Sequence, residues 1–450
     1  MSIQAISTKV ISTLGNKESL VPMIIKDGVD SASLTIKSFK EGGPVEGIDR
    51  FVDEFGTQAI WIGGIPLYKK IIDKTIYKAA KINPDVDPRI IANKEYANWA
   101  VENAKGFMSK KGNQTVKEAL TDCLKDGGKL AKNLFTGKVI AATALTLGSF
   151  FALTKLKQNN TKKAVINDIK SQYEKNSTTF AGLQTGNSKV FEDISSFSTK
   201  QSKPSFKGGM IQKAVEGIMF NPVHNMKIID AGITTERLAC SRNKTEFCEH
   251  AIKEGGFLFF LYGFGNLIEK GVNKFSEKVL HKPIELGIDV LMDEQLATAL
   301  QKGSILDDIA QMPAKDKSLT EKLNFVIQNP DNIVVKAAKK SNIVSTAIDA
   351  SGKQVVDTSK YISTQALEEL AEQLKNIDSK FKASGQDVSK YLKKSQWLKV
   401  GSVAANIGVS CLFLGYLIPK AIYAFREMKT GSTKFHVAED IKKNNKKDLV

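Results

Sequence analysis

Residues 400–419 (VGSVAANIGVSCLFLGYLIP) decide the fold class, because they carry no charged side chain over 20 consecutive positions. Nine of these residues are Val, Ile, Leu or Phe, and residues 421–425 continue the apolar run beyond Lys420. A helix of about 20 apolar residues matches the thickness of the hydrocarbon core of a bilayer. The stretch 400–425 therefore predicts a membrane-spanning helix.

A second uncharged stretch, residues 139–154 (VIAATALTLGSFFALT), lies between Lys138 and Lys155. It has 16 residues, and residues 135–138 bring it close to the length of a span. Both stretches contain small residues at helical spacing, which allow helix backbones to approach closely in lipid. We expect such contacts at Ala144, Gly148, Gly401, Ala404 and Gly408. The alternative is that both stretches are buried core helices of a large soluble protein.

Two shorter apolar runs, residues 55–68 and 255–268, have 14 residues each. That length suits a re-entrant, interfacial or core segment better than a span. Each run continues into a helix with an apolar stripe beside a ladder of lysines, which is typical of a helix on an anionic membrane surface. The lysines expected to contact that surface are Lys70, Lys74, Lys78, Lys270, Lys274 and Lys278. A solvated face of a soluble helix would give a similar pattern.

The two blocks resemble each other at an offset of 200 residues. The identical pairs are Glu54 and Glu254, Gly56 and Gly256, Gly63 and Gly263, Leu67 and Leu267, and the lysines of the two ladders. Each block is followed by one of the long apolar stretches. This shared order predicts an internal duplication, with a first helical repeat at 1–163 and a second at 209–434.

The remaining segments complete the predicted organisation. Residues 164–208 are rich in Ser, Thr, Asn and Gln, which predicts a polar flexible linker. Residues 285–395 are predicted to be helices inserted in the second repeat, and residues 435–450 a basic C-terminal tail. An apolar stripe at Leu367, Leu370, Ala371, Leu374 and Ile377 indicates one inserted helix, with Ser363 or Thr364 as its N-cap. Strand signals are confined to residues 333–335 and 354–356, so we expect a mainly α, helical, membrane-associated protein.

Charge and composition limit the classes of partner that we expect for this chain. The chain has 65 Lys+Arg against 48 Asp+Glu, a formal net charge of +17, and only five of the basic residues are Arg. Arginine grips phosphate and reads guanine in a bidentate manner, whereas lysine acts as a point charge. We therefore expect anionic lipid at a membrane surface as the partner rather than nucleic acid. Four scattered cysteines favour a reducing compartment.

The N-terminus does not resemble a secretory signal, because Ile3, Ile6, Val10, Ile11 and Leu14 recur at helical spacing without a continuous apolar run. We expect an amphipathic helix of the mature protein, with no cleaved signal peptide, and a membrane of the inner or cytoplasmic type.

No motif for catalysis is present, and we expect no catalytic residue, no cofactor and no metal site. The one cluster with any ligand character is Cys240, Cys248 and His250, whose spacing does not match the paired short spacings of zinc sites. Cys248 and His250 are two positions apart, which turns them away from each other on a helix. We expect a buried thiol beside an exposed imidazole.

These observations favour a non-enzymatic integral membrane protein that organises or scaffolds partners at an anionic membrane surface, through a protein partner or a homo-oligomer. One alternative is a transporter or channel subunit built from two repeats. Against it, none of the four apolar runs contains Asp, Glu, Lys or Arg, apart from Lys420 beside the longest run. The other alternative is a soluble, Lys-rich nucleic-acid-binding protein, which requires both long apolar stretches to be core.

Overall fold

The computed structural model describes residues 10, 13–14, 19–108, 114–177, 222–276, 278 and 286–447. Nearly all of this part is helical, with one pair of short strands, so the predicted mainly α class is confirmed. Most of the amphipathic helix predicted at the N-terminus, most of the predicted linker and residues 448–450 lie outside the described residues.

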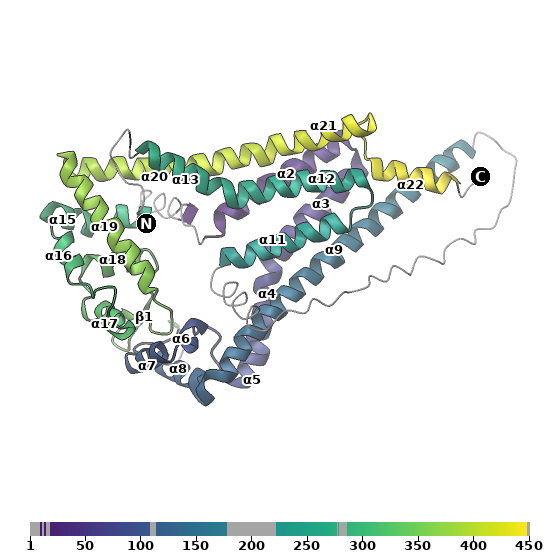
Figure 1. The fold of residues 1–450 in the computed structure, drawn as a ribbon. Coiled ribbons are helices and arrows are strands. Elements are labelled where there is room, and N and C mark those ends of the chain that lie inside the picture. Colours follow the sequence, from purple (N-terminus) through teal and green to yellow (C-terminus); the bar gives the residue numbers. More distant parts are fainter. Residues whose placement is uncertain are drawn as a thin grey trace.

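Long helices form a bundle, and short helices gather in a globular domain at one end of it (Figure 1). We call residues 19–177 the first half and residues 222–447 the second half. The bundle elements of the first half are α2 (Val21–Glu41), α3 (Pro44–Ala59), η1 (Ile60–Gly64), α4 (Ile65–Ile72), η2 (Asp73–Tyr77), α5 (Lys78–Ala80) and α9 (Lys129–Ser177). Those of the second half are α11 (Pro222–Ala239), α12 (Lys244–Leu258), η4 (Phe259–Gly263), α13 (Phe264–Phe275), α20 (Val388–Leu412), η6 (Phe413–Leu417), α21 (Ile418–Thr430) and α22 (His436–Lys447).

The two halves pack in the same order. In the first half α2 packs on α3 and α3 packs on α9, while in the second half α11 packs on α12 and α12 packs on α21. The first helix of each half also crosses to the other half, because α2 packs on α20 and η6, and α11 packs on α9. Each half therefore packs against the first helix of the other half.

The globular domain is built from both halves. The first half supplies α6 (Pro88–Ala92), α7 (Lys94–Glu102), α8 (Val116–Leu124) and η3 (Lys125–Gly128). The second supplies α14 (Ile288–Leu291), α15 (Glu294–Lys302), α16 (Ile305–Ala310), α17 (Leu319–Gln328), α18 (Ile333–Lys340), β1 (Thr346–Ile348), β2 (Gln354–Val356) and α19 (Thr364–Ser384). The strands pair antiparallel, with Ala347 opposite Val355.

A conventional apolar core holds this domain together. Trp99, Leu120, Leu323, Val334 and Leu374 belong to one large cluster of buried hydrophobic residues. Polar contacts then fix the two halves against each other: Trp99 Nε1 donates to Asn324 Oδ1 at 2.8 Å, and the Ile362 amide donates to the Tyr96 hydroxyl at 2.6 Å. In this domain the apolar side chains are inside, as in most water-soluble proteins.

Local sequence explains several helix boundaries. Ser363 caps α19, as predicted, and its hydroxyl accepts from the Ala366 amide, while Gly385 ends the helix in the left-handed region at φ 59°. The predicted stripe of α19 is buried, which confirms the helix predicted there. The strand signal at 354–356 is confirmed as β2, but the one at 333–335 is wrong. Asn332 caps a helix there, and packing in the domain core overrides the β propensity of that segment.

Two predicted segments differ from the structure. Residues 164–177, assigned to the flexible linker, continue α9, because Val165 is buried in that stretch and Lys157 and Thr161 are buried just before it. The predicted C-terminal tail contains α22, which packs on α9 and buries His436 and Val437. Composition alone missed both because tertiary packing stabilises polar helices.

The two short apolar runs are middle sections of continuous helices. In the first half α3, η1 and α4 follow without a break, and in the second half α12, η4 and α13 do the same. Each run contains a π-helical turn, at Ile60–Gly64 and at Phe259–Gly263, which lie almost 200 residues apart. Neither described run reverses direction as a re-entrant segment would.

Candidate functional site

Helix α3 buries its charged side chains and exposes its apolar ones. Its buried residues are Glu46, Gly47, Asp49, Arg50, Asp53 and Glu54. On the opposite face, the side chains of Ile48 and Phe51 are 55% and 51% exposed. This is the reverse of the arrangement in the globular domain.

Helix α12 has the same inverted character. Its buried residues are Glu246, Glu249, His250, Lys253 and Glu254, which lie 200 positions after the buried charged residues of α3. Phe247 is 47% exposed. The two helices thus present equivalent charged faces to the centre of the bundle.

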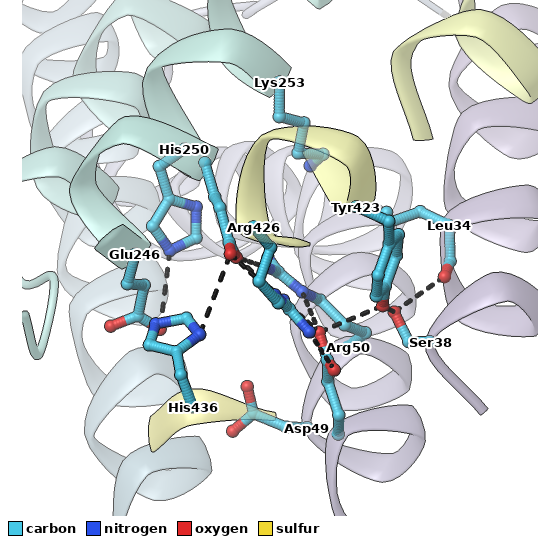
Figure 2. Close-up of polar contacts among 12 residues, drawn as sticks. Leu34, Ser38, Asp49, Arg50, Glu246, His250, Lys253, Tyr423, Arg426 and His436 are labelled. Atoms are coloured by element: carbon cyan, nitrogen blue, oxygen red, sulfur yellow. Dashed lines mark hydrogen bonds and ion pairs between the residues drawn. The ribbon is translucent and has the colours of Figure 1, made fainter. Parts of the chain in front are cut away.

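We call the part of this network nearest α21 and α22 the outer layer. Its carboxylates are Glu46, Asp49, Glu246 and Glu249, its arginines are Arg50, Arg242 and Arg426, and its histidines are His250 and His436. Figure 2 shows the Arg426 guanidinium reaching carboxylates from both halves. Arg426 is fully buried and donates to Glu46 at 2.6 and 2.7 Å and to Glu249 at 2.7 and 2.8 Å.

Further contacts link the residues of the outer layer. The Tyr423 hydroxyl contacts Ser38 at 2.8 Å and donates to Glu46 at 3.0 Å (Figure 2). Arg242 donates to Asp49 at 3.1 Å and to Glu246 at 3.0 Å. Bidentate arginine–carboxylate pairs of this kind are among the strongest hydrogen bonds in proteins, and they fix geometry. The outer layer therefore acts as a clamp between the halves.

We call the part nearer the apolar runs the inner layer. Its carboxylates are Asp27, Asp30, Asp53, Glu54, Asp230 and Glu254, and its cations are Lys157, Arg237 and Lys253. Lys253 of α12 donates to Glu54 of α3 at 2.7 Å. Arg237 of α11 pairs with Glu254 and lies 3.5 Å from Asp53. These ion pairs join helices of both halves.

A pocket opens beside the inner layer. It encloses about 400 Å³, including its open mouth, and is lined by Asp27, Glu54, Thr57, Trp61, Asp230, Ile233, Arg237, Lys253, Glu254 and Phe257. Both halves contribute to the lining, and Glu54 and Glu254 enter from equivalent positions of α3 and α12. The pocket therefore lies where the two halves meet.

Packing against the long helices repeats as well. A Cβ placed on Gly56 would lie 2.8 Å from Leu153 of α9, and one on Gly256 would lie 2.4 Å from Ile418 of α21. Eight residues further along the long helices, Thr161 contacts Asp49 and Arg426 contacts Glu249. The two contacts are therefore eight positions apart on both α9 and α21, and their partners on α3 and α12 differ by 200 positions in both cases.

The six predicted lysines are all exposed, at the ends of α3–α5 and α12–α13 that lead into the globular domain. Ala144, Gly148, Gly401, Ala404 and Gly408 are also exposed. A Cβ on Gly148, Gly401 or Gly408 would meet nothing within 4 Å, so these residues make no close helix contact inside this chain. Close approaches between bundle helices occur instead at other glycines, among them Gly56, Gly232, Gly256 and Gly415.

Cys248 and His250 correct one expectation. His250 is 3% exposed and Cys248 is half-buried, which reverses the predicted buried thiol and exposed imidazole. The reason is that His250 belongs to the charged face of α12, where its Nε2 lies 3.8 Å from Glu246.

The network itself was not predicted from the sequence. Charges at Glu46, Asp49, Arg50, Asp53 and Glu54 follow helical spacing, which usually indicates a solvated face. No signal in the sequence separates the two cases, because the opposite face has Ile48, Phe51, Val52 and Phe55 at helical spacing, as a core-facing stripe would. Chemically, the site combines fixed arginine clamps with an acidic inner layer that can bind positive charge.

No family model, no curated protein and no solved structure matches this chain.

Proposed function

We propose that this chain is an integral membrane protein whose bundle lies in lipid and whose globular domain lies in water. The observation that carries the proposal is that the two regions place their charged and apolar side chains in opposite ways. The globular domain buries one large apolar core, whereas the bundle buries a charged network beside two smaller apolar clusters and exposes large apolar side chains. In lipid, charged side chains face the interior of a bundle and apolar ones face the acyl chains.

The exposed apolar surface has the dimensions of a bilayer core. The exposed residues between positions 48 and 67 are Ile48, Phe51, Ala59, Ile62, Gly63, Pro66 and Leu67. At about 1.5 Å per residue this stretch covers about 30 Å, which is the thickness of the hydrocarbon region. Two helices, within Val116–Gln172 and Val388–Thr430, are long and apolar enough to span it, and only 22% and 28% of their apolar windows are buried.

The boundary between the bundle and the globular domain supports the same placement. The six exposed lysines stand there, and Trp397 on α20 is 68% exposed at the same end. Lysine and tryptophan are favoured at the headgroup level, where the charge meets anionic lipid and the indole bridges apolar and polar surroundings. We assign this boundary to an anionic membrane surface of the inner or cytoplasmic type.

An internal duplication belongs to the proposal. Its support is the repeated burial of charges on α3 and α12, the paired π-helical turns, and the matched glycine contacts with α9 and α21. Arg50 pairs with Glu249 and Glu54 pairs with Lys253, so α3 and α12 run in the same direction. The two halves are then parallel repeats, related by an axis along the membrane normal.

The role we propose is non-enzymatic. The bundle anchors the chain, and the globular domain, to which both halves contribute, is presented to partners at the membrane surface. The exposed small residues of α9 and α20 offer a face for a second copy or another membrane helix. A soluble nucleic-acid-binding role would need the long apolar stretches to be core, yet Leu145 and Leu412 are 50% and 55% exposed.

A transporter or channel subunit is the second candidate. The pocket between the halves favours it, because binding sites of two-repeat transporters lie at the repeat interface. Flux of protons or metal cations into proteoliposomes that contain the purified chain would support this candidate over the scaffold.

The test of membrane insertion is retention in the membrane fraction after an alkaline carbonate wash. We expect the wild-type chain to be retained, and Leu145→Lys and Leu412→Lys to be released or degraded, because each places a charge on the lipid-facing surface. The matched control is Leu306→Lys, which changes a 41% exposed leucine of the globular domain and should leave retention unchanged. A wild-type chain that is soluble and monomeric without detergent would refute the proposal.

A further inference from the structure

The two layers of the buried network differ in their balance of charge. The outer layer has four carboxylates against three arginines and two histidines, so one protonated histidine neutralises it. The inner layer has six carboxylates, Asp27, Asp30, Asp53, Glu54, Asp230 and Glu254, against three cations, Lys157, Arg237 and Lys253. The inner layer therefore carries an excess of three acidic groups.

Lys26 does not remove this excess. It is buried, but its Nζ donates to the Phe260 carbonyl at 3.1 Å and to Asn406 Oδ1 at 3.0 Å. Even with Lys26 counted, six carboxylates face four cations. Burial of unpaired ionised carboxylates costs many kcal/mol, so such groups take up a proton or a cation instead.

Asp30 is the inner-layer group with the poorest compensation. Its side chain is 1% exposed, and neither of its carboxylate oxygens has a hydrogen-bond partner. The nearest cation is Lys253, whose Nζ lies 4.0 Å from Oδ2 and already donates to Glu54 and Glu254. The charged groups that act on Asp30 are Lys253, Glu54, Asp27 and Glu254, from α12, α3 and α2. Three of the four are themselves acidic.

A second carboxylate of this kind comes from the other half. Asp230 on α11 is 6% exposed, lines the pocket and accepts a hydrogen bond from the Tyr262 hydroxyl. Asp27 on α2 lines the same pocket. The side chains of the described residues form no group of three His, Cys, Asp or Glu placed to chelate a metal ion. Dispersed carboxylates suit single protons better than a coordinated metal.

We propose that the inner layer is a proton-binding site shared by the two halves. Asp30 holds one proton, and the carboxylates at the pocket, Asp27 and Asp230, share the others. Burial and the excess of acidic groups support this site whether or not the bundle crosses a membrane. A site that exchanges protons through the pocket would make the contact between the halves sensitive to pH, since each proton lost restores a repulsive charge at their interface.

The test is a count of protons released on unfolding. The full-length chain, purified in detergent, is unfolded with sodium dodecyl sulfate in weakly buffered solution near pH 7 that contains a pH-indicator dye. Carboxyl groups protonated in the folded protein lose their protons in the unfolded chain, where aspartate ionises well below pH 7. We expect Asp30→Asn to release about one proton fewer per molecule than the wild type. Asp331→Asn, at a 94% exposed carboxylate of the globular domain, is the matched control and should release the same number as the wild type.

Two further arms keep the outcome decisive. If Asp30→Asn does not fold, Asp230→Asn provides the same comparison from the other half and is also expected to lose about one proton. Equal release from the wild type and from whichever of these variants folds would overturn the proposal. Replacing sodium by N-methylglucamine should not change the count. An increase in proton release without sodium would show that a metal cation, rather than protons, balances the site, and would also overturn it.

Discussion

Gly56 and Gly256 occupy equivalent places in the two halves, and each leaves room for a branched side chain of the long helix that follows. Leu153 fills the space over Gly56, and Ile418 fills the space over Gly256. Gly56 and Gly256 are identical in sequence at the 200-residue offset, but the residues that meet them are not. The space at each glycine is therefore a property shared by both halves, while the side chain that occupies it can vary.

This relationship predicts the effect of adding one methyl group. Gly256→Ala places a Cβ 2.4 Å from Ile418 Cδ1, so either the side chain or the helix must shift. We expect a loss of about 1–3 kcal/mol in the free energy of unfolding, typical of overpacking. Thermal unfolding in detergent measures it. Gly148→Ala is the matched control, because open space surrounds that position, and its expected effect is neutral or slightly stabilising through helix propensity. Equal destabilisation by both changes would contradict the contact.

Removing the Arg426 guanidinium should loosen the clamp between the halves. Arg426→Met leaves Glu46 and Glu249 without their main partner in a fully buried site. Loss of one partner from a buried ion pair costs about 3–5 kcal/mol. The triple variant that adds Glu46→Gln and Glu249→Gln should recover part of that stability, as measured by thermal unfolding. Arg89→Met, at a partly exposed pair with Asp87, is the control and should cost less.

The lysines at the boundary predict a preference for anionic lipid. Changing Lys70, Lys74 and Lys78 to Gln, or changing Lys270, Lys274 and Lys278, should weaken binding to vesicles containing phosphatidylserine by about 1 kcal/mol for each lysine that faces the surface. The loss should be larger at low salt than at high salt. The control trio is Lys315, Lys317 and Lys353, which are exposed on the globular domain. Similar losses for boundary and control lysines would indicate a general charge effect.

The three tryptophans allow the depth of individual residues in the bilayer to be measured. In a Trp61→Phe, Trp99→Phe background the remaining Trp397 should be quenched by lipids brominated close to the headgroup. Trp99, which is buried in the globular domain, should resist quenching when it is the remaining indole. Bromolipid fluorescence quenching measures both. Trp397 that is not quenched would place the start of α20 away from the bilayer.

The direction of two helices gives a topological prediction. Gly232 packs on Leu147 and Gln158 donates to the Cys240 carbonyl, so α11 and α9 run in the same direction. Ser177 and Pro222 consequently lie at opposite ends of the bundle. Cysteines placed at these two positions, in a variant whose own cysteines are changed to Ser, should be labelled from opposite sides of a sealed vesicle. Labelling of both from one side would mean that the bundle lies at the membrane surface, because the connecting segment is too polar to lie in hydrocarbon.

Much of the architecture could be predicted from sequence periodicity. The two long apolar helices, the inserted helices and the Ser363 cap depend on local patterns, and these predictions agree with the structure. The predictions failed where packing between distant segments decides the outcome. Residues 333–335 have strand propensity and form a helix, and residues 164–177 of the predicted linker form a helix.

The ionic network could not be predicted for the same reason. Glu46 and Arg426 lie 380 residues apart, and nothing local to either residue shows that they form an ion pair. Charges at helical spacing look alike whether they face water or another charged helix. The structure supplies the discriminating information on the other face of α3, where Ile48 and Phe51 are 55% and 51% exposed.

Because the globular domain is built from segments far apart in the sequence, its folding depends on the order in which they are synthesised. Residues of α7 contact α17 and the segment before α19, which are made more than 200 positions later, as the pairs Trp99–Asn324 and Tyr96–Ile362 show. Until most of the chain has been synthesised, the apolar side chains of the first-half segment therefore lack the residues on which they pack. We infer that the domain closes only after α19 has been made, so that a chain truncated before α14 would present an exposed apolar surface to chaperones and proteases.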